Sequence, residues 1–115
     1  METKIPGVKL GGAQNGTSLR GYVTTSYAKL VGLLGEPNGQ TDDYKVSTEW
    51  VVTYRGESYT IYDYKETNLY DEGAPTVEEF RAQSSYEWHI GGAHEASAFL
   101  QVLARATEGT FRAGW

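Results

Sequence analysis

The chain has 115 residues, which suits one compact domain and is too short for two. It contains no cysteine, so disulfide bonds, thiolate metal sites and a cysteine nucleophile are excluded. A formal net charge of −5 argues against broad binding to nucleic-acid phosphates. No apolar stretch approaches the length of a membrane span, and the N-terminus does not resemble a signal peptide. We therefore expect no direct nucleic-acid or membrane partner.

The first segment, residues 1–17, is rich in glycine and poor in large apolar side chains. This composition predicts a flexible N-terminal tail. Residues 18–106 are predicted to form a single domain, and residues 107–115 a C-terminal tail. The domain begins with a short alternating strand at Leu19–Val23.

The first helix is predicted from Tyr27 to Leu34, where apolar residues recur on one helical face. Ser26 offers an N-cap hydroxyl. Gly35 and Pro37 follow, and this pair is typical of a helix end.

The strongest strand pattern is a hairpin, in which Val46–Tyr54 and Ser58–Tyr64 alternate around a short loop at Arg55–Glu57. The segment Glu66–Gln83 is long for a connection in a small domain, which makes it a candidate functional loop. A short helical turn is predicted within it at Val77–Arg81.

A third long strand is predicted at Ser85–Ile90, and the chain turns helical from Ala93. The order β-α-β-β-β-α predicts an α+β fold, an antiparallel sheet of three to four strands with two helices packed on one face. The other face, which we call the open face, is polar with interleaved aromatic residues. Its predicted members are Glu49, Val51, Thr53, Thr60, Tyr62, Tyr64, Glu87 and His89.

Catalytic motifs are missing from the sequence: it has no nucleophile elbow, zinc-protease helix, phosphate-binding loop or dinucleotide fingerprint. His89 could pair with Asp63 or Glu87 as an acid–base couple. Nothing in the sequence supplies a nucleophile beside that pair. We therefore expect a protein that is not an enzyme and that holds no metal or cofactor.

Two segments suggest a site for an anionic ligand. Tyr59–Lys65 combines several tyrosines with a lysine, which suits stacking on a flat ring and pairing with a phosphate, although tyrosine is also an ordinary strand residue. Gly91 and Gly92 precede a helix, where free N–H groups could meet an anion, although the pair is also typical of a tight turn. The expected ligand-binding residues are Tyr62, Asp63, Tyr64, Lys65, Trp88, His89, Gly91 and Gly92.

A different mechanism is docking on another protein through a tyrosine-rich, acidic surface. Tyrosine and tryptophan anchor protein interfaces well, and acidic runs can occupy a basic groove on a partner. The residues expected to carry this alternative are Glu49, Tyr70, Asp71 and Glu72.

The segments Thr60–Lys65 (TIYDYK) and Trp88–Gly92 (WHIGG) resemble a family of small bacteriophage proteins, with further likeness at Gly16–Val23 and Leu33–Pro37. The resemblance implies a phage accessory protein acting in the cytoplasm of a bacterial host. Such a protein would antagonise host defence by sequestering a small nucleotide-type signal. In the alternative it would inhibit a defence or host protein in an anti-CRISPR-like mode. We expect a homo-oligomer, because two copies can close a pocket over a ligand.

Overall fold

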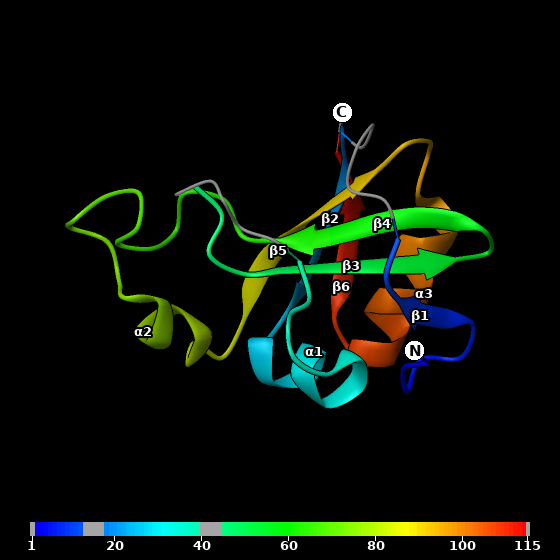
Figure 1. Ribbon diagram of the computed structural model, residues 1–115, viewed down its shortest axis with the longest axis horizontal. Helices are drawn as coiled ribbons and strands as arrows, with labels where there is room; N and C mark the ends of the chain where they lie inside the picture. The colour runs from blue at the N-terminus through cyan, green and yellow to red at the C-terminus, as the bar shows by residue number, and fades with distance from the viewer. Residues whose placement is uncertain (1, 13–17, 40–44, 115) are drawn as a thin grey trace.

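The computed structural model describes residues 2–12, 18–39 and 45–114, which form a six-stranded antiparallel sheet and three helices (Figure 1). The strand order across the sheet is β1-β3-β4-β5-β2-β6. The α+β class is confirmed, but three to four strands and two helices understate the fold. In chain order the elements are β1 (Val8–Leu10), β2 (Ser18–Thr25), α1 (Tyr27–Leu34), β3 (Glu49–Tyr54), β4 (Glu57–Tyr62), α2 (Val77–Arg81), β5 (Tyr86–Gly92), α3 (Ser97–Thr107) and β6 (Thr110–Ala113).

Helices α1 and α3 pack on one face of the sheet through their apolar stripes. The Ser26 hydroxyl oxygen accepts a hydrogen bond from the Lys29 N–H at 3.1 Å, which caps the start of α1. Gly35 ends α1 with a φ of +88°, in the left-handed region that glycine favours. Leu30 of α1 and Leu103 of α3 are almost fully buried, so both helices contribute to the same core.

The core between the sheet and these helices is rich in aromatic rings. Trp50 and Trp88, on β3 and β5, meet edge to face with their centroids 5.6 Å apart. Tyr59 stacks on Phe99 of α3 at 4.4 Å. Buried rings of this size dominate core energetics because each removes a large apolar area from water. These rings lie on the helix-covered face of the sheet, so the opposite face carries other side chains.

The β3–β4 hairpin confirms the strongest prediction, with a shorter ladder than expected. Tyr54 pairs with Glu57, and the two-residue turn between them has positive φ at Arg55 (+52°) and Gly56 (+80°), the mirror-image turn that suits hairpins. The predicted strand Val46–Tyr54 begins only at Glu49. A carboxylate rather than a neighbouring strand binds the backbone just before it, as described below.

Both predicted tails contribute a strand to the sheet. In the N-terminal segment, β1 pairs with β3, and Ile5 and Val8 are each only 2 % exposed. In the C-terminal segment, β6 pairs with β2. Residues 13–17 of the predicted N-terminal tail lie outside the described part of the chain.

The long predicted loop is anchored by α2, which forms at the expected residues. Thr76 and Glu79 cap the helix reciprocally, each side chain binding the other residue's backbone N–H. Phe80 is buried against Tyr86 and Trp88, so α2 joins the core at the end of the sheet far from α3 (Figure 1). None of the helices in the described residues is both long and apolar enough to cross a bilayer.

Candidate functional site

The open face carries a cluster of tyrosines around His89 of β5. His89 pairs in register with Tyr22 of β2 on one side and with Tyr62 of β4 on the other. Its ring centroid lies 5.1 Å from that of Tyr22, 5.3 Å from Tyr62, 5.8 Å from Tyr64 and 6.4 Å from Tyr86. Directly opposed residues on antiparallel strands point to the same face, so the register itself brings the rings of Tyr22 and Tyr62 to His89.

The same register extends the cluster into a line across five strands. Glu49 of β3 pairs with Tyr62, Tyr62 with His89, His89 with Tyr22, and Tyr22 with Arg112 of β6. We call these five residues the cross-sheet row. The row runs from a carboxylate through three aromatic rings to a guanidinium, on the face that α1 and α3 leave uncovered.

Arg112 is oriented at its end of the row by two contacts. Its Nε and Nη2 atoms donate to the two carboxylate oxygens of Glu87 at 2.7 and 2.9 Å. Its guanidinium carbon lies 3.9 Å from the ring centroid of Tyr22, a cation–π contact. The hydrogen bonds from Arg112 lower the pKa of Glu87, so the pair is ionised at neutral pH.

Burial controls the protonation of the ring groups. Desolvation lowers the pKa of His89 from its ordinary value near 6.5, and Arg112 acts in the same direction, while Asp63 and Glu87 oppose the shift. Desolvation also raises the pKa of the Tyr62 and Tyr86 hydroxyls. At neutral pH His89 and Tyr62 are therefore uncharged rings within the row.

An exposed loop, residues 64–72, borders the cluster at the end of β4. Lys65 has a left-handed backbone (φ +60°), and its Nζ lies 5.1 Å from the ring centroids of both Tyr64 and Tyr70. Interaction with the Tyr64 and Tyr70 hydroxyls raises the pKa of Lys65. The side chains of Leu69 and Tyr70 are 51 % and 41 % exposed. Apolar and aromatic groups of this loop thus face solvent, and the loop joins the row through the contact of Tyr64 with His89.

Only some of the expected ligand-binding residues meet here. Tyr62, Tyr64 and His89 lie in the cluster, and Lys65 lies beside it. Trp88 points to the opposite face, where it is 1 % exposed and donates its indole N–H to the Thr25 carbonyl at 3.1 Å. Trp88 therefore does not join the cluster, because strand alternation places it in the core.

Asp63 is fully buried and has a structural task. Its Oδ1 accepts the backbone N–H groups of Ser47 and Thr48 at 2.8 Å each, and its Oδ2 accepts the Ser47 hydroxyl at 2.7 Å. These bonds take the place of ladder bonds just before β3. They also occupy the carboxylate that we expected either at the ligand site or as the acid–base partner of His89.

Gly91 and Gly92 do not converge with Lys65. Tyr59 pairs with Gly92 and Tyr62 with His89, so the two glycines and Lys65 lie at opposite ends of the β4–β5 pair. Both glycines are buried within β5, and α3 begins only at Ser97. The backbone N–H of Ser97 is already bound by the carboxylate of Glu95. The structure therefore does not bring this turn and Lys65 together into one pocket.

The residues expected for protein docking are divided between the row and the 64–72 loop. Glu49 forms one end of it, and Tyr70, Asp71 and Glu72 lie in the 64–72 loop, with Asp71 and Glu72 exposed. The second carboxylate proposed for His89, Glu87, is held by Arg112 instead. Among the described residues no group of three or more His, Asp or Glu side chains is arranged to hold a metal ion.

Sequence reasoning missed Tyr22 and Arg112. Tyr22 stands in a correctly predicted strand, and its alternation with buried Val23 is the signal that places it on the open face. Arg112 lies in a four-residue strand whose side chains are all exposed, so it has no hydrophobic period to detect.

A comparison of the chain with models of protein families finds no match, and comparisons with curated proteins and with solved structures find none either.

Proposed function

We propose that this is a non-catalytic binding protein that docks on another protein through the cross-sheet row and the adjacent 64–72 loop. The observation that carries the proposal is the row itself: three packed rings between a carboxylate and a guanidinium, on a face that no helix covers. Tyrosine and arginine are the residue types enriched at the energetic centres of protein interfaces. Rings that are already packed lose little side-chain freedom on binding.

The charges around the row favour a partner with a basic rim. Glu49 closes one end of the row, and Asp71 and Glu72 are exposed in the loop that follows β4. Arg112 is neutralised by Glu87 at the other end. Complementary charges at a rim accelerate association and set its orientation more than they add affinity.

The resemblance to small bacteriophage proteins suggests where such a partner would be found. We propose a defence or host protein in the cytoplasm of a bacterium, blocked in an anti-CRISPR-like mode. A docked rather than catalytic inhibitor needs no nucleophile or metal, which agrees with the absence of catalytic motifs from the sequence.

A second candidate is sequestration of a small anionic, nucleotide-type ligand, and one observation favours it. The Lys65 ammonium lies over both the Tyr64 and Tyr70 rings, so a flat base could stack beside a cation that pairs with phosphate. Because Gly91, Gly92 and Trp88 lie elsewhere, this site would be an open shelf. We therefore place it second.

The test is to retain partners from a phage-susceptible bacterium on the immobilised protein and repeat the binding with purified components. Tyr22→Ala and Tyr62→Ala alter the row, and Lys29→Ala, at an exposed residue of α1, is the control. We expect a partner that binds the wild type and Lys29→Ala and loses at least about tenfold in affinity with either row variant. Equal affinity for all four proteins would overturn the proposal. A nucleotide that raises the melting temperature of the wild type but not of Lys65→Ala would instead establish the second candidate.

A further inference from the structure

The two edges of the sheet differ in whether the described chain covers them. At the β1 edge, Glu2 pairs with Lys9, and the Thr3 N–H donates to the Val8 carbonyl at 3.2 Å, so the chain covers its own edge. At the other edge, β6 pairs with β2 on its inner side, and no described residue pairs with its outer side. An uncovered edge strand is a template for another strand, which proteins usually block.

The ladder identifies the backbone groups that face outward from β6. The Gly114 N–H donates to the Arg20 carbonyl at 3.1 Å. The adjacent pair, Gly21 and Ala113, is therefore of the kind that exchanges no hydrogen bonds. Because such pairs alternate with bonded ones, Arg112 directs its N–H and C=O toward β2. Phe111 therefore directs its N–H and C=O away from the sheet.

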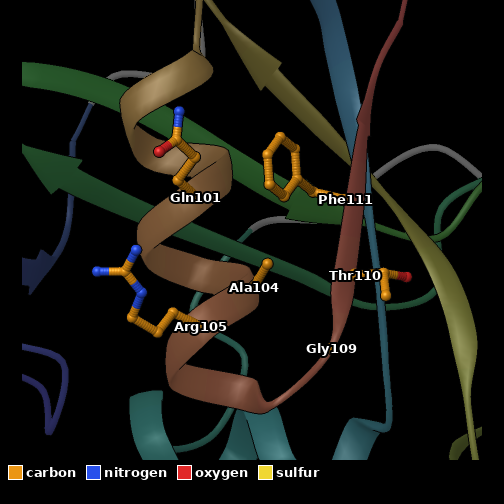
Figure 2. A pocket seen from close by; sticks show the side chains of 6 residues that line it. All are labelled: Gln101, Ala104, Arg105, Gly109, Thr110 and Phe111. Atoms are coloured by element: carbon orange, nitrogen blue, oxygen red, sulfur yellow. The ribbon is translucent and has the colours of Figure 1, made fainter.

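The side chain of Phe111 is also incompletely covered. It lies on the helix face and is 46 % exposed, beside a hollow of about 520 Å³ between α3 and β6 (Figure 2). Gln101, Ala104 and Arg105 of α3 line the other side of this hollow. The ring and the unpaired N–H and C=O of Phe111 lie side by side, so one partner can cover both.

We propose that this occupant is a second copy of the chain, which pairs its β6 antiparallel to the first across a two-fold axis at Phe111. In this register the two Phe111 residues exchange N–H···O=C bonds, and their rings lie side by side on the helix face over the two hollows. Aromatic pairs directly opposed across strands stabilise a sheet. In this register two copies of β6 match each other in backbone hydrogen bonds and in side chains. Such a match suits a dimer in which both copies use the same surface.

Charge distinguishes this register from the one with the axis shifted by one residue. Shifting the axis to Arg112 would place two arginines directly opposite each other, which is unfavourable. With the axis at Phe111, each Arg112 instead lies opposite a Thr110, while it remains bound to its own Glu87. The two sheets then continue into one another, with both cross-sheet rows on the same side. This dimer would present the proposed docking surface twice.

Phe111→Pro provides a selective test, because it removes an outward N–H and spares the N–H groups bonded to β2. Sedimentation equilibrium should give twice the chain mass of 12.7 kDa for the wild type and at least about tenfold weaker association for Phe111→Pro. Circular dichroism and the melting temperature check that the variant folds. A wild type that stays monomeric at concentrations of several hundred micromolar, or equal association of the variant, would overturn the dimer.

A second experiment does not depend on the proline variant. The chain has no cysteine, so Phe111→Cys introduces a single thiol. Directly bonded antiparallel partners have Cα atoms about 5.5 Å apart, a separation that a disulfide spans. Mild oxidation should cross-link Phe111→Cys much faster than Leu69→Cys, an exposed control in the 64–72 loop. Equal rates would contradict pairing at Phe111.

Discussion

The hydroxyl of Tyr86 lies 3.4 Å from Nδ1 of His89, although the two side chains leave β5 toward opposite faces of the sheet. Tyr86 packs edge to face against Phe80 and Trp88 in the core, and its hydroxyl emerges at the end of β4. There it also accepts the backbone N–H of Tyr64 at 3.4 Å. One phenol therefore connects the core to the open-face cluster and to the start of the 64–72 loop.

Removing that hydroxyl should loosen the connection. We expect Tyr86→Phe to lower the free energy of unfolding by about 1 kcal/mol, because two hydrogen-bonding groups lose their shared partner. Urea unfolding measures the change. Tyr59→Phe is the control, since no hydrogen bond to its hydroxyl is found among the described residues and its ring stays stacked on Phe99. A loss as large in the control would assign the effect to packing rather than to the hydroxyl.

His89 should make stability depend on pH in mildly acidic solution. Because burial lowers its pKa in the folded state below 6.5, the unfolded chain binds more protons between the two values. Stability should therefore fall as the pH drops below about 6.5 and level off beneath the folded pKa. We expect His89→Gln to lose this part of the slope in urea unfolding between pH 5 and pH 7. His94→Gln, which removes the other histidine, is the control, and an unchanged slope in His89→Gln would refute the assignment.

The buried carboxylate of Asp63 should be among the most sensitive positions outside the apolar core. Asp63→Ala leaves the Ser47 and Thr48 N–H groups without their acceptor, and we expect a loss of about 3 kcal/mol in the free energy of unfolding. Asp63→Asn keeps an oxygen for these N–H groups and should lose clearly less. Equal losses in the two variants would mean that the hydrogen bonds do not stabilise the segment before β3.

Two glycines should respond in opposite directions to the same substitution. A Cβ at Gly32 of α1 would meet nothing within 4 Å, so Gly32→Ala should stabilise the protein by about 0.5–1 kcal/mol through helix propensity. A Cβ at Gly21 of β2 would lie 2.7 Å from Leu100 Cδ1 and 2.8 Å from the Arg112 carbonyl oxygen. Gly21→Ala should therefore destabilise by about 1–3 kcal/mol. Melting temperatures of the pair give the sign directly.

The fold could be predicted where a hydrophobic period ran over six or more residues. The β3–β4 hairpin, β5, α1 and α3 all have that length, and each was found. Strands β1 and β6 have three and four residues, and they are held by neighbours far away in sequence. A strand this short has too few residues to show an alternating hydrophobic pattern. It forms only when its neighbour, β3 or β2, is in place.

The sequence predicted several single residues of the site but not how they are arranged relative to one another. Alternation placed Tyr62 and His89 on the open face, and the structure adds the register that aligns them with Glu49, Tyr22 and Arg112. Register between strands distant in sequence depends on tertiary packing and could not be derived from local pattern. The misplaced Gly91–Gly92 turn has the same origin, since it assumed which strand ends meet.

The pairing of β2 with β5 has a consequence for synthesis. β2 is complete at Thr25, but its inner partner ends only at Gly92, and its outer partner β6 is made later still. At elongation rates of about 5–20 residues per second, β2 waits several seconds with both edges and the side chain of Val23 unpaired. The β3–β4 hairpin can form locally in that interval and pair with β1, so a nascent chain would hold three strands before β2 finds a partner. Ribosome-bound chains truncated before β5 should therefore resist proteolysis only within β1 and the hairpin.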